Sequence, residues 1–216
     1  MSIHHKLISL RNTLFVILLC FVVYHSVYFE SLTRHNEKKN SQIFDARVYA
    51  RNFWNTILPE ILDNAVEITA LLSLLQSDLN QAIDHYGGTV GVSRTHAFLV
   101  KGMGRITNIK QDGIVLELNE TGKDTIIIQT DYIFGNAIRD ASRVIQVSDF
   151  TSTMEFNAIS NEINKIVLSE VIPSFIDSVK IEDTLKFIGA IEINENNINF
   201  ASLQIVPLSV SYVKSK

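Results

Sequence analysis

The chain has 216 residues, enough for one or two domains with a buried core. Hydrophobic residues make up 46% and charged residues 19%, which excludes a disordered chain. The net charge is −4, and the 19 basic residues are scattered among 23 acidic ones. The sequence therefore lacks the Lys/Arg-rich face that is typical of a nucleic-acid-binding protein. Cys20 is the only cysteine, which excludes an internal disulfide and a cysteine-based metal site.

The N-terminal run from Asn12 to Phe29 is apolar and has no formal charge. As a helix it would be about 27 Å long, close to the ~30 Å hydrocarbon core of a bilayer. Lys6 and Arg11 precede it, so the positive-inside rule predicts a cytoplasmic tail over 1–11 and a transmembrane signal anchor over 12–29. The polar residues 30–43 then form a tether. We therefore expect a single-pass protein of the cytoplasmic (inner) membrane whose bulk is extracytoplasmic, or periplasmic.

Three alternatives compete with the anchor. A buried core helix is disfavoured for an N-terminal run this apolar, and a cleaved signal peptide is disfavoured because no Ala-x-Ala pattern follows the run. A lipoprotein signal would place the lipid on Cys20, but Leu18 and Leu19 stand where small residues are expected. The pattern favours an uncleaved anchor.

Residues 44–93 have helical periodicity and predict a small helical subdomain. Asp45 is a suitable N-cap, Pro59 suits the first turn of a new helix, and Ser77 can cap the next. Gly87 and Gly88 should end that helix. We expect the aromatic residues near the start of the module to pack in its core rather than to form a ligand shelf: Tyr49, Phe53 and Trp54.

Beyond Arg94 the hydrophobic period becomes that of strands. Five strands are expected, at 97–109, 114–118, 125–129, 185–193 and 198–206. Gly102 and Gly104 mark a bend or bulge in the first strand. A helix capped by Ser152 and Glu155 and ended by Pro173 separates the third and fourth strands. This order predicts an α+β fold with an OB-like five-stranded β-barrel over 94–216; an unrelated α+β sandwich is the alternative.

The segment from Gly135 to Phe150 places charged residues among apolar ones, where a charge must be paired or hydrogen-bonded. The functional interpretation is a polar pocket at one end of the barrel, holding a small ligand or a partner's carboxylate. The structural interpretation is a salt bridge, with Asp140 pairing Arg139, Arg143 or Lys101 and Asp149 capping the following helix. The candidate site residues are Lys101, Arg139, Asp140 and Asp149.

No catalytic, metal or cofactor motif is recognisable. Of the six histidines only His85 and His96 fall in the part expected to fold, and neither has a partner at metal-ligand spacing. Ser93 lacks the following glycine of a nucleophile elbow. We therefore expect a protein that is not an enzyme and uses no cofactor.

Several motifs resemble a bacterial family of predicted periplasmic lipoproteins, domain of unknown function 2291. They cover residues 44–207 in the right order, and the matching residues are Phe44-Asp45-Ala46, Tyr49, Trp54, Phe98-Leu99-Val100-Lys101-Gly102, Gly104, Gly135, Ala137-Ile138-Arg139-Asp140-Ala141, Asp149-Phe150-Thr151, Glu155-Phe156, Gly189-Ala190 and Ile205-Val206-Pro207. The resemblance implies a small helical domain on an OB-like α/β domain, attached to the membrane outside the cytoplasm and often associated with sugar-uptake transporters of the ATP-binding-cassette type. It implies no catalytic residues. Cys20 departs from the family pattern because it lacks a convincing lipobox.

Two functional hypotheses follow. The first is a membrane-anchored, non-enzymatic accessory or interaction protein that meets a transporter or another envelope protein. The second is a binding domain for a small, sugar-like molecule, because one face of an OB-like barrel suits oligosaccharides. Nucleic acid is not an expected partner.

Overall fold

The computed structural model describes residues 44–119 and 124–213, together with Phe15 and Phe21. The described residues from 45 onward form one compact unit, to which residues 1–44 do not belong. The predicted tail, anchor and tether over 1–43 lie outside the described residues, except for Phe15 and Phe21, which are helical and have exposed side chains. Within the described ranges, no helix is long and apolar enough to cross a membrane.

The first part of the compact unit is helical. Its elements are α3 (Ala46–Asn52), the π-helical η1 (Phe53–Ile57), α4 (Leu58–Ile61), the 3-10 turn η2 (Leu62–Asn64), the short strand β1 (Val66–Glu67), α5 (Ile68–Ser77) and α6 (Leu79–Tyr86). Asp45 caps α3 as expected, because its Oδ1 accepts hydrogen bonds from the backbone N–H groups of Arg47 and Val48. Ser77 does not cap α6. Asp78 does, since its carboxylate reaches the N–H of Gln81 at 2.9 Å.

Gly87 and Gly88 end α6 at Tyr86 and also form β2, which pairs antiparallel with β3 (Thr95–Ile109). A Cβ atom at Gly88 would collide with the carbonyl oxygen of Asp140 in α7 (Ala137–Ser142). Glycine at position 88 therefore lets the backbones of β2 and α7 approach each other closely. The glycine pair thus ends α6 and also serves close packing.

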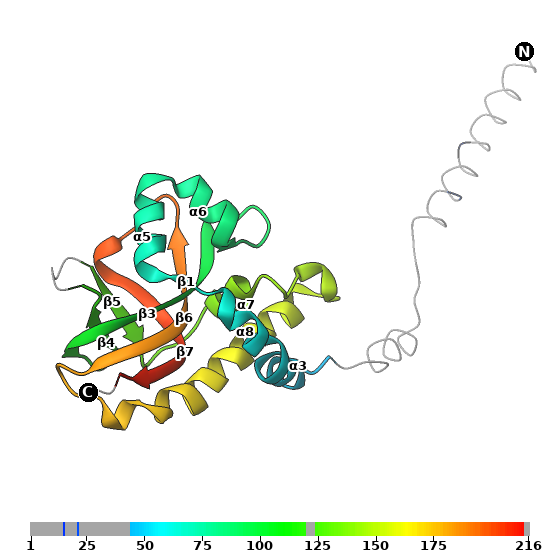
Figure 1. The fold of residues 1–216 in the computed structure, drawn as a ribbon. Coiled ribbons are helices and arrows are strands. Elements are labelled where there is room, and N and C mark those ends of the chain that lie inside the picture. The colour runs from blue at the N-terminus through cyan, green and yellow to red at the C-terminus, as the bar shows by residue number, and fades with distance from the viewer. Residues whose placement is uncertain (1–14, 16–20, 22–43, 120–123, 214–216) are drawn as a thin grey trace, which may run out of the picture. The chain divides into compact units, whose positions relative to one another are not determined.

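Five strands close into a ring (Figure 1). These strands are β3, β4 (Gly113–Glu117), β5 (Thr125–Gln129), β6 (Thr184–Asn194) and β7 (Leu203–Tyr212). β3 pairs with β4, β4 with β5, β5 with β7, β7 with β6, and β6 returns to β3. Only the β5–β7 pair in this ring is parallel. β3 closes the ring because its first eleven residues pair with β6 and its end pairs with β4.

Two strand predictions were wrong in detail. No bulge lies at Gly102 or Gly104, where β3 stays in register with β6; the irregular pairing with β4 lies between Ile106 and Asn108. The two glycines serve close packing, because a Cβ at either would meet neighbouring atoms at 2.8 Å. The last strand was expected at 198–206 but spans Leu203–Tyr212. The residues before it form a loop with the 3-10 turn η7 (Phe200–Ser202), and the strand extends to Tyr212, whose hydroxyl donates to the carbonyl oxygen of Phe175.

The connection between β5 and β6 is helical and packs outside the ring. It contains α7, the 3-10 turn η3 (Val147–Asp149), α8 (Thr153–Ile166), the π-helical η4 (Val167–Val171) and the 3-10 turns η5 (Ile172–Ser174) and η6 (Ile176–Ser178). Ser152 caps α8 as predicted, while the Glu155 carboxylate accepts from the N–H and hydroxyl of Thr151. Asp149 does not cap α8. It closes η3 by accepting from the N–H of Gln146.

The ring therefore has an inner and an outer face. The inner face forms the main core, with fully buried side chains from every strand: Phe98, Val100, Ile106, Ile114, Leu116, Ile126, Ile128, Leu185, Phe187, Ile191 and Ile205. Because side chains alternate along a strand, the outer face of β3 and β6 carries Ala97, Leu99, Ala190 and Glu192. α7 and α8 pack together on this side of the ring (Figure 1). Ala97, Leu99 and Ala190 are buried there.

Candidate functional site

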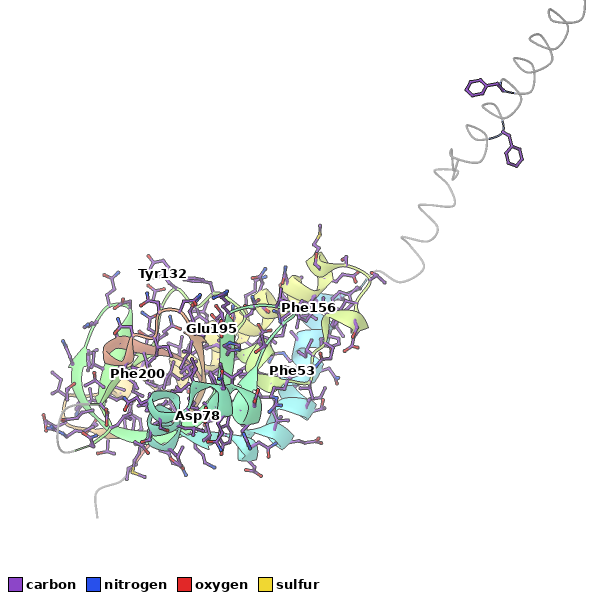
Figure 2. All side chains as sticks on the ribbon, turned by 90° about the horizontal axis from the view of Figure 1, so that it is seen from above. Phe53, Asp78, Tyr132, Phe156, Glu195 and Phe200 are labelled. Carbon is purple, nitrogen blue, oxygen red and sulfur yellow. The ribbon has the colours of Figure 1, made fainter. Side chains whose placement is uncertain are left out.

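The segment between β5 and α7 is shaped by two residues in the left-handed region of backbone space. Tyr132 has φ of 52° and Gly135 has φ of 89°. The resulting turns bury Ile133 and leave Tyr132 and Phe134 70% and 78% exposed. Figure 2 shows Tyr132 at the margin of the described unit. Asn164 of α8 donates from Nδ2 to the carbonyl oxygen of Gly135 at 3.0 Å, which fixes where α7 begins.

Arg139 of α7 is a buried charge, with a relative exposure of 3%. Its Nε donates to Asp140 Oδ1 at 2.7 Å, and its Nη1 donates to the carbonyl oxygen of Phe156 and to Asn157 Oδ1, both at 3.2 Å. The guanidinium carbon also lies 3.6 Å from the centroid of the Phe156 ring. Nη2 has no hydrogen-bond partner within the described residues. One edge of a buried guanidinium thus remains available to a ligand.

Glu192 of β6 faces Arg139 and Asp140 from the sheet. Its Oε1 accepts from the backbone N–H of Asn136 at 3.3 Å. The surrounding protein removes water from this carboxyl group and raises its pKa, and the charge of Asp140 raises it further. The Asn136 hydrogen bond and the charge of Arg139 partly oppose this shift. Glu192 is therefore easier to protonate than an ordinary glutamate.

These groups line a hollow between the outer face of β3–β6 and the helices. We call it the Arg139 pocket, and its volume is about 490 Å³. The lining residues are Val90, Ser93, Thr95, Ala97, Asn136, Arg139, Asp140, Val147, Thr153, Phe156, Asn157 and Glu192. Hydroxyl, amide, guanidinium and carboxylate groups all reach it. Such a set can hold a polar ligand in a defined orientation.

Two of the four predicted site residues line this pocket, and two do not. Arg139 and Asp140 are there and form an ion pair with each other. Lys101 points to the same face of β3 as Ala97, but it lies four residues further along the strand, about 13 Å away. Asp149 is taken up by η3 and contributes to a raised pKa of Tyr49, which is caused first by burial.

Sequence reasoning missed Glu192 and the partners of His96. Glu192 lies between Ile191 and Ile193 and follows the ordinary alternation of a half-exposed strand, so no local signal marked it as a site residue. His96 is buried, with Nδ1 at 2.5 Å from the Thr89 hydroxyl and Nε2 at 3.4 Å from Glu195. These contacts tie β3 to the two loops beside it. The described residues contain no group of three or more His, Cys, Asp or Glu that could hold a metal ion.

The fold is of the α+β class and is similar to that of OB-fold proteins. The crystal structure of an OB-fold protein from Thermotoga maritima superposes on this chain with a TM-score of 0.71 and 26% sequence identity. The match covers 79% of this chain and 99% of the other. No functionally curated protein matches the chain.

The chain belongs to the family described as predicted periplasmic lipoprotein (DUF2291), whose model matches residues 17–211. The resemblance carried by the sequence motifs is thereby confirmed. The family description indicates an extracytoplasmic location. The association with sugar-uptake transporters, which the resemblance also implied, stays a prediction.

Replacing Arg139 by alanine should lower the free energy of unfolding by about 3–5 kcal/mol, because Asp140 and the Phe156 carbonyl would lose a buried partner. Arg51→Ala is the matched control. Arg51 also pairs with a carboxylate, that of Glu170 at 2.6 Å, but both side chains are nearly half exposed, so its loss should cost about 0–1 kcal/mol. Urea unfolding of the detergent-solubilised chain measures both. Equal losses of unfolding free energy in the two variants would contradict a larger contribution to stability from the buried Arg139 pair.

Replacing Glu192 by glutamine should change how stability depends on pH. A carboxyl group whose pKa is raised on folding contributes stability that is present below its usual pKa of 4.5 and is lost as the pH rises through the raised value. The wild type should therefore lose stability relative to Glu192→Gln as the pH increases from about 4 toward neutrality. Melting temperatures measured across this range test the expectation.

Glu60→Gln controls for the removal of one negative charge, because Glu60 is exposed on α4. A difference in melting temperature between wild type and Glu192→Gln that stays constant over this range would contradict the raised pKa of Glu192.

Proposed function

We propose that this chain is a membrane-anchored, extracytoplasmic, non-enzymatic accessory protein, and that its partner is a sugar-uptake transporter of the ATP-binding-cassette type. The observation that carries the proposal is the match to a family of predicted periplasmic lipoproteins over residues 17–211. This range includes most of the apolar run and nearly all of the described compact unit. The anchor over 12–29 and the tether over 30–43 would hold the OB-like barrel near membrane proteins. Tethering raises the effective concentration of a weakly bound partner without new contacts.

Removal of residues 1–30, with export supplied by a cleavable signal, should yield a folded periplasmic protein that no longer supports sugar uptake. The measurement compares uptake of a panel of radiolabelled sugars in cells that lack the chain and are complemented with either form. Full uptake with the untethered form would contradict the need for an anchor. If cells that lack the chain take up every sugar of the panel normally, the transporter assignment is contradicted.

A Cys20→Ser variant separates the anchor from lipid attachment. Because the apolar run itself would span the membrane, the serine variant should remain in the membrane fraction and support uptake. Release of the variant into the soluble fraction would instead assign the attachment to a lipid on Cys20.

A second candidate function, binding of a small sugar-like ligand, is favoured by the charges of the Arg139 pocket. Asp140 already neutralises Arg139, and Glu192 adds a carboxyl group, so an anionic ligand meets repulsion. The free Nη2 edge of Arg139 and the Glu192 carboxyl group together suit a ligand that both accepts and donates hydrogen bonds. A neutral polyhydroxyl compound fits both, since neighbouring hydroxyl groups can accept from Nη2 of Arg139 and donate to Glu192.

Thermal shift of the solubilised chain tests this second function with D-glucose, D-galactose, D-xylose, D-ribose and maltose as probes. A sugar present at a hundred times its dissociation constant should stabilise the protein by about 2.7 kcal/mol. Asn157→Ala, which removes an exposed pocket amide, should weaken the shift. Citrate, as an anionic probe, should give none. A larger shift with citrate than with any sugar would contradict the assignment to a neutral ligand.

A further inference from the structure

A second hollow lies on the same outer face of the ring, over β5, β6 and β7. We call it the Phe134 pocket; its volume is about 330 Å³. Its lining comprises Gln129, Phe134, Ala137, Ala190, Glu192, Ile193, Asn194, Asn197, Ile198, Asn199, Ser202, Leu203, Gln204 and Val206. Ala190 pairs with Val206 across β6–β7, and Ile127 pairs with Gln204 across β5–β7. These pairs put the floor of the pocket on the outer face, side by side with the Arg139 pocket.

Glu192 lines both pockets. The start of α7 also borders both pockets: Asn136 lines the Arg139 pocket, and the next residue, Ala137, lines the Phe134 pocket. Glu192 and the start of α7 therefore lie at the boundary between the two hollows. A molecule long enough to extend past Glu192 would contact both pockets.

The Phe134 pocket has the chemistry of a hydroxyl-rich ligand. Gln129 Nε2 donates to Gln204 Oε1 at 2.9 Å, which orients both amides. The Gln129 oxygen and the Gln204 nitrogen have no hydrogen-bond partner within the described residues, so the pair presents an acceptor and a donor together. Asn197 and Ser202 add groups of the same kind from the β6–β7 loop. A hydroxyl group both donates and accepts, and matches such a lining.

Phe134 supplies a flat apolar surface at this pocket. Its side chain is 78% exposed even though an aromatic ring gains about 2 kcal/mol or more from burial. The backbone holds it there, because buried Ile133 anchors the segment, Asp131 Oδ1 accepts from the Tyr132 N–H, and Gly135 is held by Asn164. The C–H face of a pyranose ring carries partial positive charge and packs on the negative face of an aromatic ring.

We propose that the Phe134 pocket is the second subsite of one carbohydrate site, that the Arg139 pocket is the first, and that the ligand is a disaccharide or longer saccharide that crosses Glu192. The proposal rests on the sugar-binding function proposed above. In the second subsite Phe134 stacks on the sugar ring while Gln129, Gln204 and the β6–β7 loop bond its hydroxyl groups. An apolar protein partner fits less well, because most of the side chains around Phe134 in this pocket are polar.

Isothermal titration of the full-length chain in detergent micelles tests the second subsite. The probes are maltose, cellobiose and lactose, with D-glucose and D-galactose as the matching single rings. One of the disaccharides should bind more tightly than its component rings. Phe134→Leu, which keeps an apolar side chain but removes the ring, should weaken that disaccharide roughly tenfold and leave the single sugars unchanged. Phe134→Tyr should restore binding.

Met103→Ala is the matched control, since Met103 is also an exposed apolar residue and lies on β3 away from both pockets. Single sugars that bind as tightly as disaccharides, together with unchanged affinities in Phe134→Leu, would overturn the second subsite and leave the Arg139 pocket as a binding site. Absence of heat with every probe would overturn sugar binding in both pockets. Phe134→Leu leaves a folded chain in either case, because the ring is exposed; its melting temperature verifies this.

Discussion

The buried charge of Arg139 constrains the helical side of the molecule. A guanidinium group removed from water must find a counter-charge and acceptors for its N–H groups. Asp140 supplies the counter-charge from the same helix. The further acceptors come from α8, through the Phe156 carbonyl and Asn157 Oδ1. These hydrogen bonds hold α7 in position against α8. Gly88 lets the backbone of β2 approach α7 closely. This second contact positions α7 against the helical part that precedes the ring.

The ring contributes the other half of the site through alternation. Inward residues fill the core, while the outer face of β3 and β6 carries the buried apolar residues Ala97, Leu99 and Ala190 where α7 packs. At the paired ends of β3 and β6, Thr95, Asn194 and Glu192 are polar and line the pockets beside the start of α7. The two pockets are thus a consequence of a short helix lying on a longer pair of strands. The position of the two pockets and the polarity of their lining therefore have the same structural cause.

The sequence predicted the order of the elements well, because periodicity, caps and turns are local properties. The strand expected at 125–129 is β5 itself, and Asp45 and Ser152 cap the helices that they were expected to cap. The last strand was misplaced because Ile198 continues an apolar pattern although the chain there belongs to a loop. The site was predicted only in part. Arg139 and Asp140 are neighbours in sequence, whereas Glu192 joins them through the register of β3 with β6, which no local pattern encodes. Lys101 shared the right face but not the right distance.

The raised pKa of Glu192 has a bearing on what the site can bind. Burial of the Glu192 carboxyl group and the nearby charge of Asp140 raise its pKa and so disfavour its ionised form. A ligand whose hydroxyl groups donate hydrogen bonds to Glu192 would stabilise the ionised carboxylate and lower its pKa again. A ligand without hydrogen-bond donors would favour the protonated group. Binding of a polyhydroxyl compound should therefore release a proton from Glu192 when the pH lies near its raised pKa. The same carboxyl group that lines both pockets would then couple their occupancy to pH.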